Sequence, residues 1–312
     1  MDASSCPICR HGVTCIQVFD TSELAHQYKR QISVDVRGEF LNIDKICLNR
    51  CTDCDFIYFS PALNGSEGFY EKLQENSWYY LEEKPEFATA RRHMRRTDRV
   101  LDIGCGSGAF AKYHPAGNYV GLEYTASSVA KAQAKKLSVF KQSIEQYAAT
   151  APEPFEVVCA FQVLEHVSDQ RLFIRACADI CRPGGKIIFS TPNADAFISA
   201  VKNCVLNFPP HHTAWFSRKL WANLTRYFPL RTVEIVEESL EPIHQPLYAS
   251  TLVQAALERF LHMRSPPLID GSLRNRILGK ISRLGGRLLA GGLTDARLQP
   301  KGQSITVVYE RI

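Results

Sequence analysis

The chain has 312 residues, 45% of them hydrophobic and 22% charged, and a formal net charge of +5. This length allows one large domain and a smaller one, with enough apolar residues for a buried core. The positive charge is too small and too dispersed to indicate a nucleic-acid partner. No apolar run approaches the roughly 20 residues that cross a bilayer, and the first ten residues lack the apolar centre of a signal peptide. We therefore expect a cytoplasmic protein.

Residues 1–65 contain six of the 11 cysteines. Four of these form two CxxC pairs, in which two thiolates three positions apart on a tight turn can face one ion. Because two such pairs complete a closed tetrahedral site, we expect the ion to stabilise the fold and to take no part in catalysis. The sequence thus predicts a zinc-ribbon-like segment whose metal ligands are Cys6, Cys9, Cys51 and Cys54.

Two alternatives to this zinc site remain at the level of the sequence. The spacing of four reduced cysteines can arise by chance, and Cys15 or Cys47 can replace one of the ligands. A redox role for either pair is less favoured, because no thioredoxin-like βαβ pattern surrounds it.

Residues 66–97 are rich in aromatic and charged side chains, and we expect helices that link or cap the next region. Over residues 98–312, short apolar runs alternate with amphipathic stretches, which is typical of a doubly wound parallel sheet. In such sheets, ligands bind at the carboxyl ends of the strands. The first five strands are expected at 99–103, 119–123, 138–142, 156–161 and 186–191, with helices at 110–113, 125–136 and 170–181.

Two further strands are expected at 232–239 and 303–310, with a helical insertion between them at about 245–300. From residue 271 to residue 301 the insertion carries seven basic residues and one acidic residue. Apolar residues three or four positions apart predict a helix with one apolar face and a neighbouring basic stripe. Such a helix can lie on an anionic membrane, close over a phosphorylated substrate, or simply pack on the domain.

The stretch "VLDIGCGSGAF" predicts a strand, a glycine-rich turn and a helix. Gly104, Gly106 and Ala109 satisfy the permissive dinucleotide pattern, and Glu123 follows at the end of the next strand. A carboxylate there can accept both hydroxyls of a ribose, which NAD and S-adenosylmethionine share. Asp102, immediately before the glycines, suits a cationic amino group better than a pyrophosphate, and therefore favours S-adenosylmethionine.

Four successive segments of the chain, "VLDIGCGSG", "GLEYT", "FQVLEHV" and "RPGGKIIFSTPN", resemble the motifs of class I S-adenosylmethionine-dependent methyltransferases. The similarity is closest to the ubiquinone-biosynthesis-like O-methyltransferase group. It implies a Rossmann-like, doubly wound, mostly parallel sheet of seven strands. The run "CPICR…CTDCDFIYFSP…FYEKLQENSWYY" resembles the zinc ribbon and aromatic helix that precede this fold in a bacterial subset, several of whose members act on sugars or other small metabolites.

The resemblance also implies which residues hold the cofactor. Asp102 would bind its amino group, Glu123 its ribose and Tyr124 its adenine. Many members carry an aspartate after the third strand, where this chain has Ser143 followed by Ile144. Phe161 and Gln162 would lie under the methionine, and the backbone of Gly104, Cys105 and Gly106 would line the same end. The pair Tyr79 and Tyr80 would either close over the cofactor or pack a helix.

A hydroxyl acceptor needs a general base, and histidine has a suitable pKa. The segment "FPPHHTAWFS" follows the fifth strand, where substrate loops lie in this fold, and the resemblance favours its second histidine. We therefore predict His212 as the base, with His166 as the second candidate.

Taken together, the sequence predicts a methyltransferase that uses S-adenosylmethionine and contains a structural zinc ion. Its expected partner is a small-molecule acceptor, methylated on oxygen, such as a sugar or sugar nucleotide; no nucleic acid is expected. Peripheral membrane contact through the basic helix is a further hypothesis. The alternatives are an NAD-dependent oxidoreductase and a non-catalytic binding module whose zinc ribbon contacts a partner.

Overall fold

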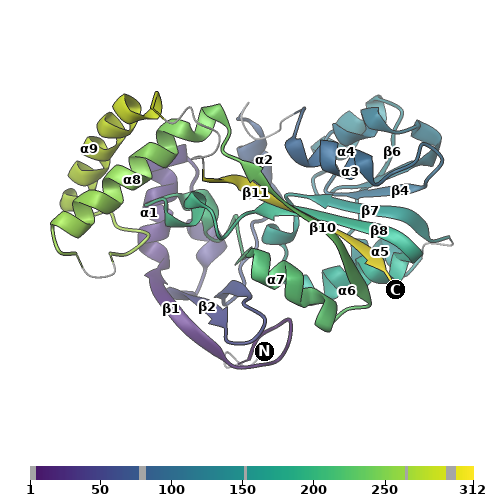
Figure 1. The fold of residues 1–312 in the computed structure, drawn as a ribbon, viewed down its shortest axis with the longest axis horizontal. Coiled ribbons are helices and arrows are strands. Elements are labelled where there is room, and N and C mark those ends of the chain that lie inside the picture. The colour runs from purple at the N-terminus through teal and green to yellow at the C-terminus, as the bar shows by residue number, and fades with distance from the viewer. Residues whose placement is uncertain (1–4, 77–81, 151–152, 264–265, 293–299) are drawn as a thin grey trace.

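The computed structural model describes residues 5–76, 82–150, 153–263, 266–292 and 300–312, which form two sheets with flanking helices (Figure 1). The larger sheet has seven strands, and each of its central strands is apolar over most of its length. From edge to edge the strands are β10 (Leu230–Ser239), β11 (Lys301–Arg311), β8 (Cys181–Pro192), β7 (Phe155–Phe161), β4 (Val100–Ile103), β5 (Tyr119–Leu122) and β6 (Ser138–Phe140).

Four neighbouring pairs of this sheet are parallel, from β8 through β7, β4 and β5 to β6, and β11 runs antiparallel to both β8 and β10. All four residues of β4 are buried, as expected for a central strand that is covered on both faces. The predicted Rossmann-like, mostly parallel sheet of seven strands is confirmed. The predicted strands coincide with the observed ones except at their ends, where β8 begins five residues before the expected position 186.

Helices cover both faces of the large sheet. Several of them begin where a side chain accepts a hydrogen bond from the first turn, such as Asp169 from the N–H of Leu172 and Ser143 from the N–H of Gln146. The helices between and around the strands are α2 (Glu67–Gln74), α3 (Pro85–Arg92), α4 (Ala126–Ala134), α5 (Ile144–Ala148), α6 (Gln170–Ile180) and α7 (Arg218–Asn223).

The smaller sheet is antiparallel and includes a strand from a distant part of the chain. The helix α1 (Thr21–Ile32) follows its first strand, and the N–H of Phe59 donates to the carbonyl of Thr213 at 2.9 Å. The sheet therefore extends beyond residue 65, the expected limit of the ribbon segment. Its strands, in order, are β1 (Val13–Asp20), β2 (Lys45–Cys51), β3 (Ile57–Ser60) and β9 (Ala214–Trp215).

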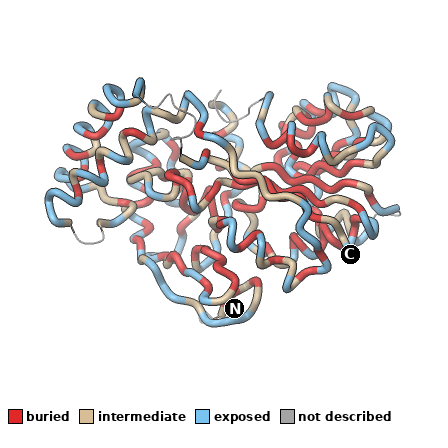
Figure 2. Tube along the Cα trace, viewed as in Figure 1, coloured by how far each residue is buried: buried red, intermediate tan, exposed pale blue. Residues whose placement is uncertain are grey.

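The two sheets share one buried core. Trp221 of α7 is fully buried, and its ring stacks on Phe216 at 4.9 Å and on Phe189 of β8 at 5.9 Å. Phe216 in turn lies 5.8 Å from Phe56, beside the cysteines of the ribbon. Figure 2 shows the continuous buried path through the strands of the large sheet.

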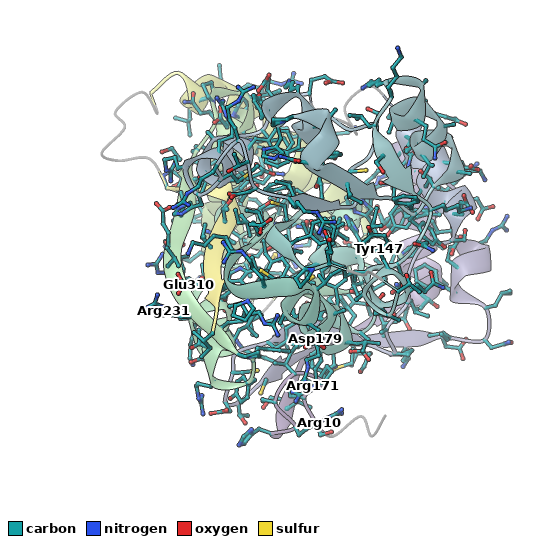
Figure 3. All side chains as sticks on the ribbon, turned by 90° about the vertical axis from the view of Figure 1, so that its right-hand side faces the viewer. Arg10, Tyr147, Arg171, Asp179, Arg231 and Glu310 are labelled. Carbon is teal, nitrogen blue, oxygen red and sulfur yellow. A yellow bond between two sulfur atoms is a disulfide. The ribbon has the colours of Figure 1, made fainter. Side chains whose placement is uncertain are left out.

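Polar contacts also join the ribbon to the large sheet. A guanidinium N–H of Arg171, on α6, donates to the carbonyl of Ile8, and Figure 3 shows Arg171 beside the segment that carries Arg10. At the edge of the large sheet, Arg231 and Glu310 form an ion pair at 2.6 Å across β10 and β11 (Figure 3). The contact of Arg171 adds to the apolar packing that fixes one sheet against the other, whereas the ion pair joins two strands of the large sheet.

Cys15 and Cys47 are not available as alternative zinc ligands, because a disulfide joins them across β1 and β2. Their Cα atoms lie 6.2 Å apart, within the range that a disulfide bridges. The structure thus removes the alternative ligand set that the sequence left open.

The insertion between β10 and β11 contains a pair of packed helices, α8 (Gln245–Phe260) and α9 (Leu273–Ala290). Figure 1 shows the pair at the opposite end of the molecule from β6. The expected helical insertion at about 245–300 is thus present in the residues that the structure describes.

Candidate functional site

The turn after β4 contains three glycines with left-handed backbone. Gly104 has φ of +68°, and a Cβ there would lie 2.4 Å from a methyl group of Val163. Gly108 has φ of +82°, and a Cβ there would lie 2.3 Å from a methyl group of Leu137. Only glycine tolerates both the positive φ and the lack of space for a Cβ. The glycine pattern therefore indicates a backbone that turns tightly against the next elements.

The N–H groups of this turn already have acceptors within the protein. Those of Gly104 and Cys105 donate to the carbonyl of Leu122 at 2.7 and 3.0 Å. The N–H of Gly106 donates to a carboxylate oxygen of Glu123 at 2.9 Å. A pyrophosphate needs such donors for itself and is repelled by a carboxylate beside them. The geometry therefore disfavours a dinucleotide at this turn.

A small pocket with a cavity volume of about 40 Å³, partly open to solvent, lies at the turn. Asp102 forms part of its wall, and its Oδ2 accepts a hydrogen bond from the hydroxyl of Tyr119 at 2.7 Å. Burial raises the pKa of Asp102 to about 7, although the Tyr119 hydroxyl opposes this shift. A cationic group in the pocket would favour the charged carboxylate.

Part of the pocket wall comes from the segment before the sheet, which sequence reasoning did not assign. Glu82, Lys84 and Phe87 face the pocket from this segment. The ring of Phe87 lies 5.1 Å from both Phe110 and Phe161 and so closes the apolar side. No local motif marks these residues, because their place depends on α3 packing over the turn. The expected Tyr79 and Tyr80 lie outside the described residues.

Of the ten expected cofactor residues, five line this pocket: Asp102, Gly104, Cys105, Gly106 and Phe161. One carboxylate oxygen of Glu123 accepts from the N–H of Gly106, which lines the pocket. The other oxygen of Glu123 accepts from the N–H of Thr125 at 3.0 Å. Tyr124 is 56% exposed, with its ring 6.1 Å from Tyr70.

The other three expected residues lie further from the turn. Ser143 caps α5, and Ile144 is buried beneath it. The amide of Gln162 points away from the turn and donates to Glu86 at 3.2 Å and to Ser304 at 3.3 Å. The two acceptors, Glu86 and Ser304, are not among the site residues predicted from the sequence.

Gln162 is therefore next to a buried acidic pair. Glu86 is 3% exposed, and the carboxyl of Glu238 packs against it. Burial and the neighbouring Glu86 raise the pKa of Glu238 to about 8. The two acids are brought together by α3 and β10, far apart in the chain, so no sequence spacing could reveal them.

The two expected base candidates lie together, with a third histidine between them. The ring of His166 lies 4.5 Å from that of His211 and 5.0 Å from that of His212. Burial lowers the pKa of His166 to about 4 and holds those of the other two well below the usual value. All three rings are therefore neutral at pH 7.

The loop that carries His211 and His212 is held by the N-terminal segment, through α1 and the residues before α2. The hydroxyl of Tyr28 donates to the carbonyl of Phe208 at 2.8 Å, and the N–H of Gly65 donates to that of Pro210 at 2.8 Å. His212 also borders a second hollow, beside Asn193 and Trp215. The N-terminal segment thus positions the histidines at the carboxyl end of β8.

The four cysteines of the two CxxC pairs form one cluster. All four sulfurs lie within 4.8 Å of one another, with Cys6 and Cys54 3.6 Å apart and Cys9 and Cys51 3.3 Å apart. A tetrahedral zinc ion with bonds of about 2.3 Å places its sulfurs about 3.8 Å apart. The N–H of Asp53 also donates to the sulfur of Cys51 at 3.4 Å, as is common around bound thiolates. The donor set and its spacing fit a closed zinc site.

Comparison with known proteins places this site in a family. A family model described as a methyltransferase domain matches residues 71–235, which are 165 of the 312 residues. The chain is 31% identical over 163 residues to the ubiquinone biosynthesis O-methyltransferase of Aromatoleum aromaticum, covering 47% of this chain and 70% of that protein. It is 35% identical over 106 residues to the protein of the same description from Cronobacter sakazakii, covering 31% of this chain and 44% of that protein.

The chain therefore belongs to the methyltransferase-domain family. Its fold is also that of a solved S-adenosylmethionine-dependent methyltransferase from Archaeoglobus fulgidus, with a TM-score of 0.50, 18% identity, and coverage of 78% of this chain and 100% of that one. This assignment favours S-adenosylmethionine over NAD at the glycine turn, in agreement with the occupied N–H groups. The chain spans less than half the length of the Cronobacter protein. Within the described ranges, every helix is too short or too polar to cross a membrane.

Proposed function

We propose that this protein transfers the methyl group of S-adenosylmethionine to a hydroxyl oxygen of a small molecule, such as a sugar or sugar nucleotide. The observation that carries the proposal is the buried carboxyl of Asp102 in the wall of a pocket whose neighbouring turn N–H groups are already occupied. Such a pocket suits a cation and disfavours a phosphate. The ubiquinone O-methyltransferases that the chain resembles support transfer to oxygen.

In this proposal, the carboxylate of Asp102 holds the amino group of the cofactor, and Glu123 accepts from its ribose. Phe87 and Phe161 cover the apolar side and exclude water. The remaining predicted contacts are the backbone of Gly104, Cys105 and Gly106 and the side chains of Tyr124, Ser143, Ile144 and Gln162.

The transfer itself requires alignment and removal of one proton. The C–S bond of the sulfonium breaks as the C–O bond forms, which leaves a neutral thioether, and the hydroxyl proton must pass to a base. We assign His212 as that base and His166 as the second candidate. The support is that His212 is neutral and borders a hollow at the carboxyl end of β8, where substrates bind in this fold.

The direct test is release of S-adenosylhomocysteine during incubation with S-adenosylmethionine and a panel of sugar nucleotides, phenols and lipid-linked intermediates. His212→Ala should reduce turnover by about 10²–10⁴-fold. The exposed His26 on α1 provides the matched control, since His26→Ala should leave turnover unchanged. Tight calorimetric binding of NAD without binding of S-adenosylmethionine would overturn the assignment, and full turnover by His212→Ala would remove this residue as the base.

We also propose that the four-cysteine cluster binds one structural Zn²⁺. Elemental analysis of the reduced, purified protein should find zinc, and Cys54→Ser should lower its content by one ion per chain. Cys204, which lies outside the cluster, gives the control variant Cys204→Ala with unchanged zinc content. Zinc content near zero in the reduced parent protein would contradict the proposal.

We further propose that α9 lies on an anionic membrane surface. Its buried face packs on α8 and holds one large apolar residue, Leu278, beside polar contacts in which Ser282 donates to Gln254 at 2.8 Å and Gln254 donates to Asn275 at 3.1 Å. Its apolar stripe therefore faces solvent, with Leu284 64% and Leu288 79% exposed. The other members of this outward apolar stripe are Leu273, Ile277 and Ile281.

Basic side chains flank this stripe, and α9 has no acidic residue. A helix that exposes an apolar stripe beside arginines and lysines is complementary to anionic lipids. Each cation near such a surface contributes about 1 kcal/mol. The basic residues beside the stripe are Arg276, Lys280, Arg283 and Arg287.

Co-sedimentation with phosphatidylglycerol vesicles should exceed that with phosphatidylcholine vesicles, and should weaken as salt is added. Leu284→Glu should reduce binding, whereas Phe140→Glu, an exposed apolar position at the other end of the molecule, should not. Equal binding to both vesicle types would contradict the proposal. So would a dimer without lipid that Leu284→Glu dissociates, because a second copy would then cover the stripe.

A further inference from the structure

Three histidines converge beside the hollow that His212 borders. One ring nitrogen from each of His166, His211 and His212 lies within 4.8 Å of the others. His211 and His212 are each 7% exposed, and their rings stack with centroids 4.5 Å apart. Imidazole nitrogens are good ligands for transition metals, and here one nitrogen of each ring converges on a common point.

The backbone fixes which nitrogen of two rings carries the proton. Nδ1 of His166 lies 2.6 Å from the carbonyl of His211, and Nδ1 of His211 lies 2.8 Å from the carbonyl of Leu206. Because a carbonyl only accepts, each Nδ1 must donate, and each Nε2 keeps its lone pair. Metal-binding histidines are oriented by the same kind of contact from the nitrogen that does not bind the metal.

A buried carboxyl adjoins the first of the three rings. Glu165 is 1% exposed, and its Oε1 lies 3.9 Å from Nε2 of His166. Its Oε2 is buried and has no hydrogen-bond partner among the described residues. An unpartnered carboxyl oxygen next to three nitrogen donors indicates a place where a positive charge would be stabilised.

We propose that His166, His211 and His212 bind a divalent transition metal ion, with Zn²⁺ as the ion that the donors suit best. Three neutral imidazoles prefer zinc to magnesium or calcium, which take oxygen ligands. Three protein ligands leave a fourth position open, as in catalytic zinc sites. This second ion is chemically distinct from the one assigned to the four cysteines.

The histidine site would also affect how the acceptor hydroxyl loses its proton. This part of the inference rests on the proposed function. A zinc ion with an open position lowers the pKa of a bound hydroxyl, and the proton then passes to solvent. In the metal-bound protein His166 and His212 would act as ligands, so the role of base assigned to His212 above would apply only to the protein without this ion. Substitution of either residue would therefore abolish metal binding even in the absence of any acceptor.

The test measures metal content and needs no substrate. The parent protein, dialysed against Zn²⁺ and then metal-free buffer, should retain two ions per chain, and His211→Ala should retain one. His26→Ala, on the exposed side of α1, should still retain two. Replacement by Co²⁺ distinguishes the two sites, because only the cysteine site gives intense thiolate-to-metal absorption.

Circular dichroism and binding of S-adenosylmethionine should be unchanged in His211→Ala, and His212→Asn provides a second variant if the first does not fold. One ion per chain in the parent, with the thiolate spectrum alone, would overturn the histidine site. Two ions that persist in both histidine variants would also overturn it. Failure of methyl transfer with two ions bound would instead count against the proposed function, so the two failures are separable.

Discussion

In the seven-stranded sheet, the cofactor turn and its acidic partners come from the ends of two strands that are neighbours in the chain. Asp102 ends the run before the glycines, and Glu123 follows β5. The four-stranded sheet is built differently, because β9 joins β3 from more than 150 residues further along the chain. The histidine loop is held by that distant pairing. The proposed donor site is therefore encoded locally, whereas the acceptor side depends on tertiary packing.

The largest expected effect tests whether the two sheets are one cooperative unit. Trp221→Ala removes the fully buried ring that packs between them, and should lower the free energy of unfolding by about 3–5 kcal/mol. Chemical denaturation followed by near-ultraviolet circular dichroism and by loss of cofactor binding should give coincident transitions. Two separate transitions would show that the sheets fold independently. Leu172→Ala, at an exposed position on α6, should change stability by less than about 0.5 kcal/mol.

The next effect concerns the locally built site alone. Glu123→Gln removes the charge that accepts from Gly106 and from the ribose, and hydrogen bonds to charged groups contribute about 1.5–3 kcal/mol. Calorimetry should therefore find S-adenosylmethionine binding weakened by about 10–100-fold. Unchanged affinity would place the ribose elsewhere. The zinc content should not change, because the cysteine cluster lies in the other sheet.

A smaller effect comes from the protonation of Asp102. Its pKa of about 7 means that the carboxyl is neutral below pH 7 and loses the charge that an ammonium group needs. Affinity for S-adenosylmethionine should therefore fall about tenfold for each pH unit below 7, and level off above it. Calorimetry between pH 5.5 and 7.5 measures this slope.

Two variants control for other titrating groups. Asp102→Asn should bind weakly with no such slope. Tyr119→Phe removes the hydrogen bond that stabilises the carboxylate, so it should move the slope to higher pH. A slope that persists in Asp102→Asn would assign the titration to another group.

The smallest effect tests how helix α1 holds the histidine loop. Tyr28→Phe removes the buried hydrogen bond to the carbonyl of Phe208 and should cost about 1 kcal/mol of stability. If this contact positions the loop, turnover should fall more than cofactor affinity does. Equal losses in both would mean that the variant acts only through global stability.

The sequence was sufficient for the large sheet and for the donor side of the site. Alternating strands and helices, and glycines that alone fit a left-handed turn, are local signals, and the predicted zinc cluster also follows from local spacing. Glu123 likewise lies where the strand pattern placed it. Each of these features is marked by residues that are close together in the chain, as are the two cysteines of each CxxC pair.

The remainder of the site depends on contacts that no local pattern carries. Phe87 reaches the pocket only because α3 folds back over the turn, and Glu86 meets Glu238 from β10 across the sheet. His211 was passed over because its value as a ligand depends on His166, on a different element. The orientation of α9 could not be predicted either. The spacing of its apolar residues predicts an apolar face but does not indicate whether that face packs on the domain or points to solvent.

The position of β11 has a consequence for how the protein is made. This strand follows β10 and the α8–α9 insertion in the chain, yet it lies between β8 and β10. During synthesis, the edges of both strands stay unpaired until residues 301–311 have left the ribosome. Unpaired edges associate with other chains, so nascent or truncated molecules should depend on chaperones until that last strand inserts.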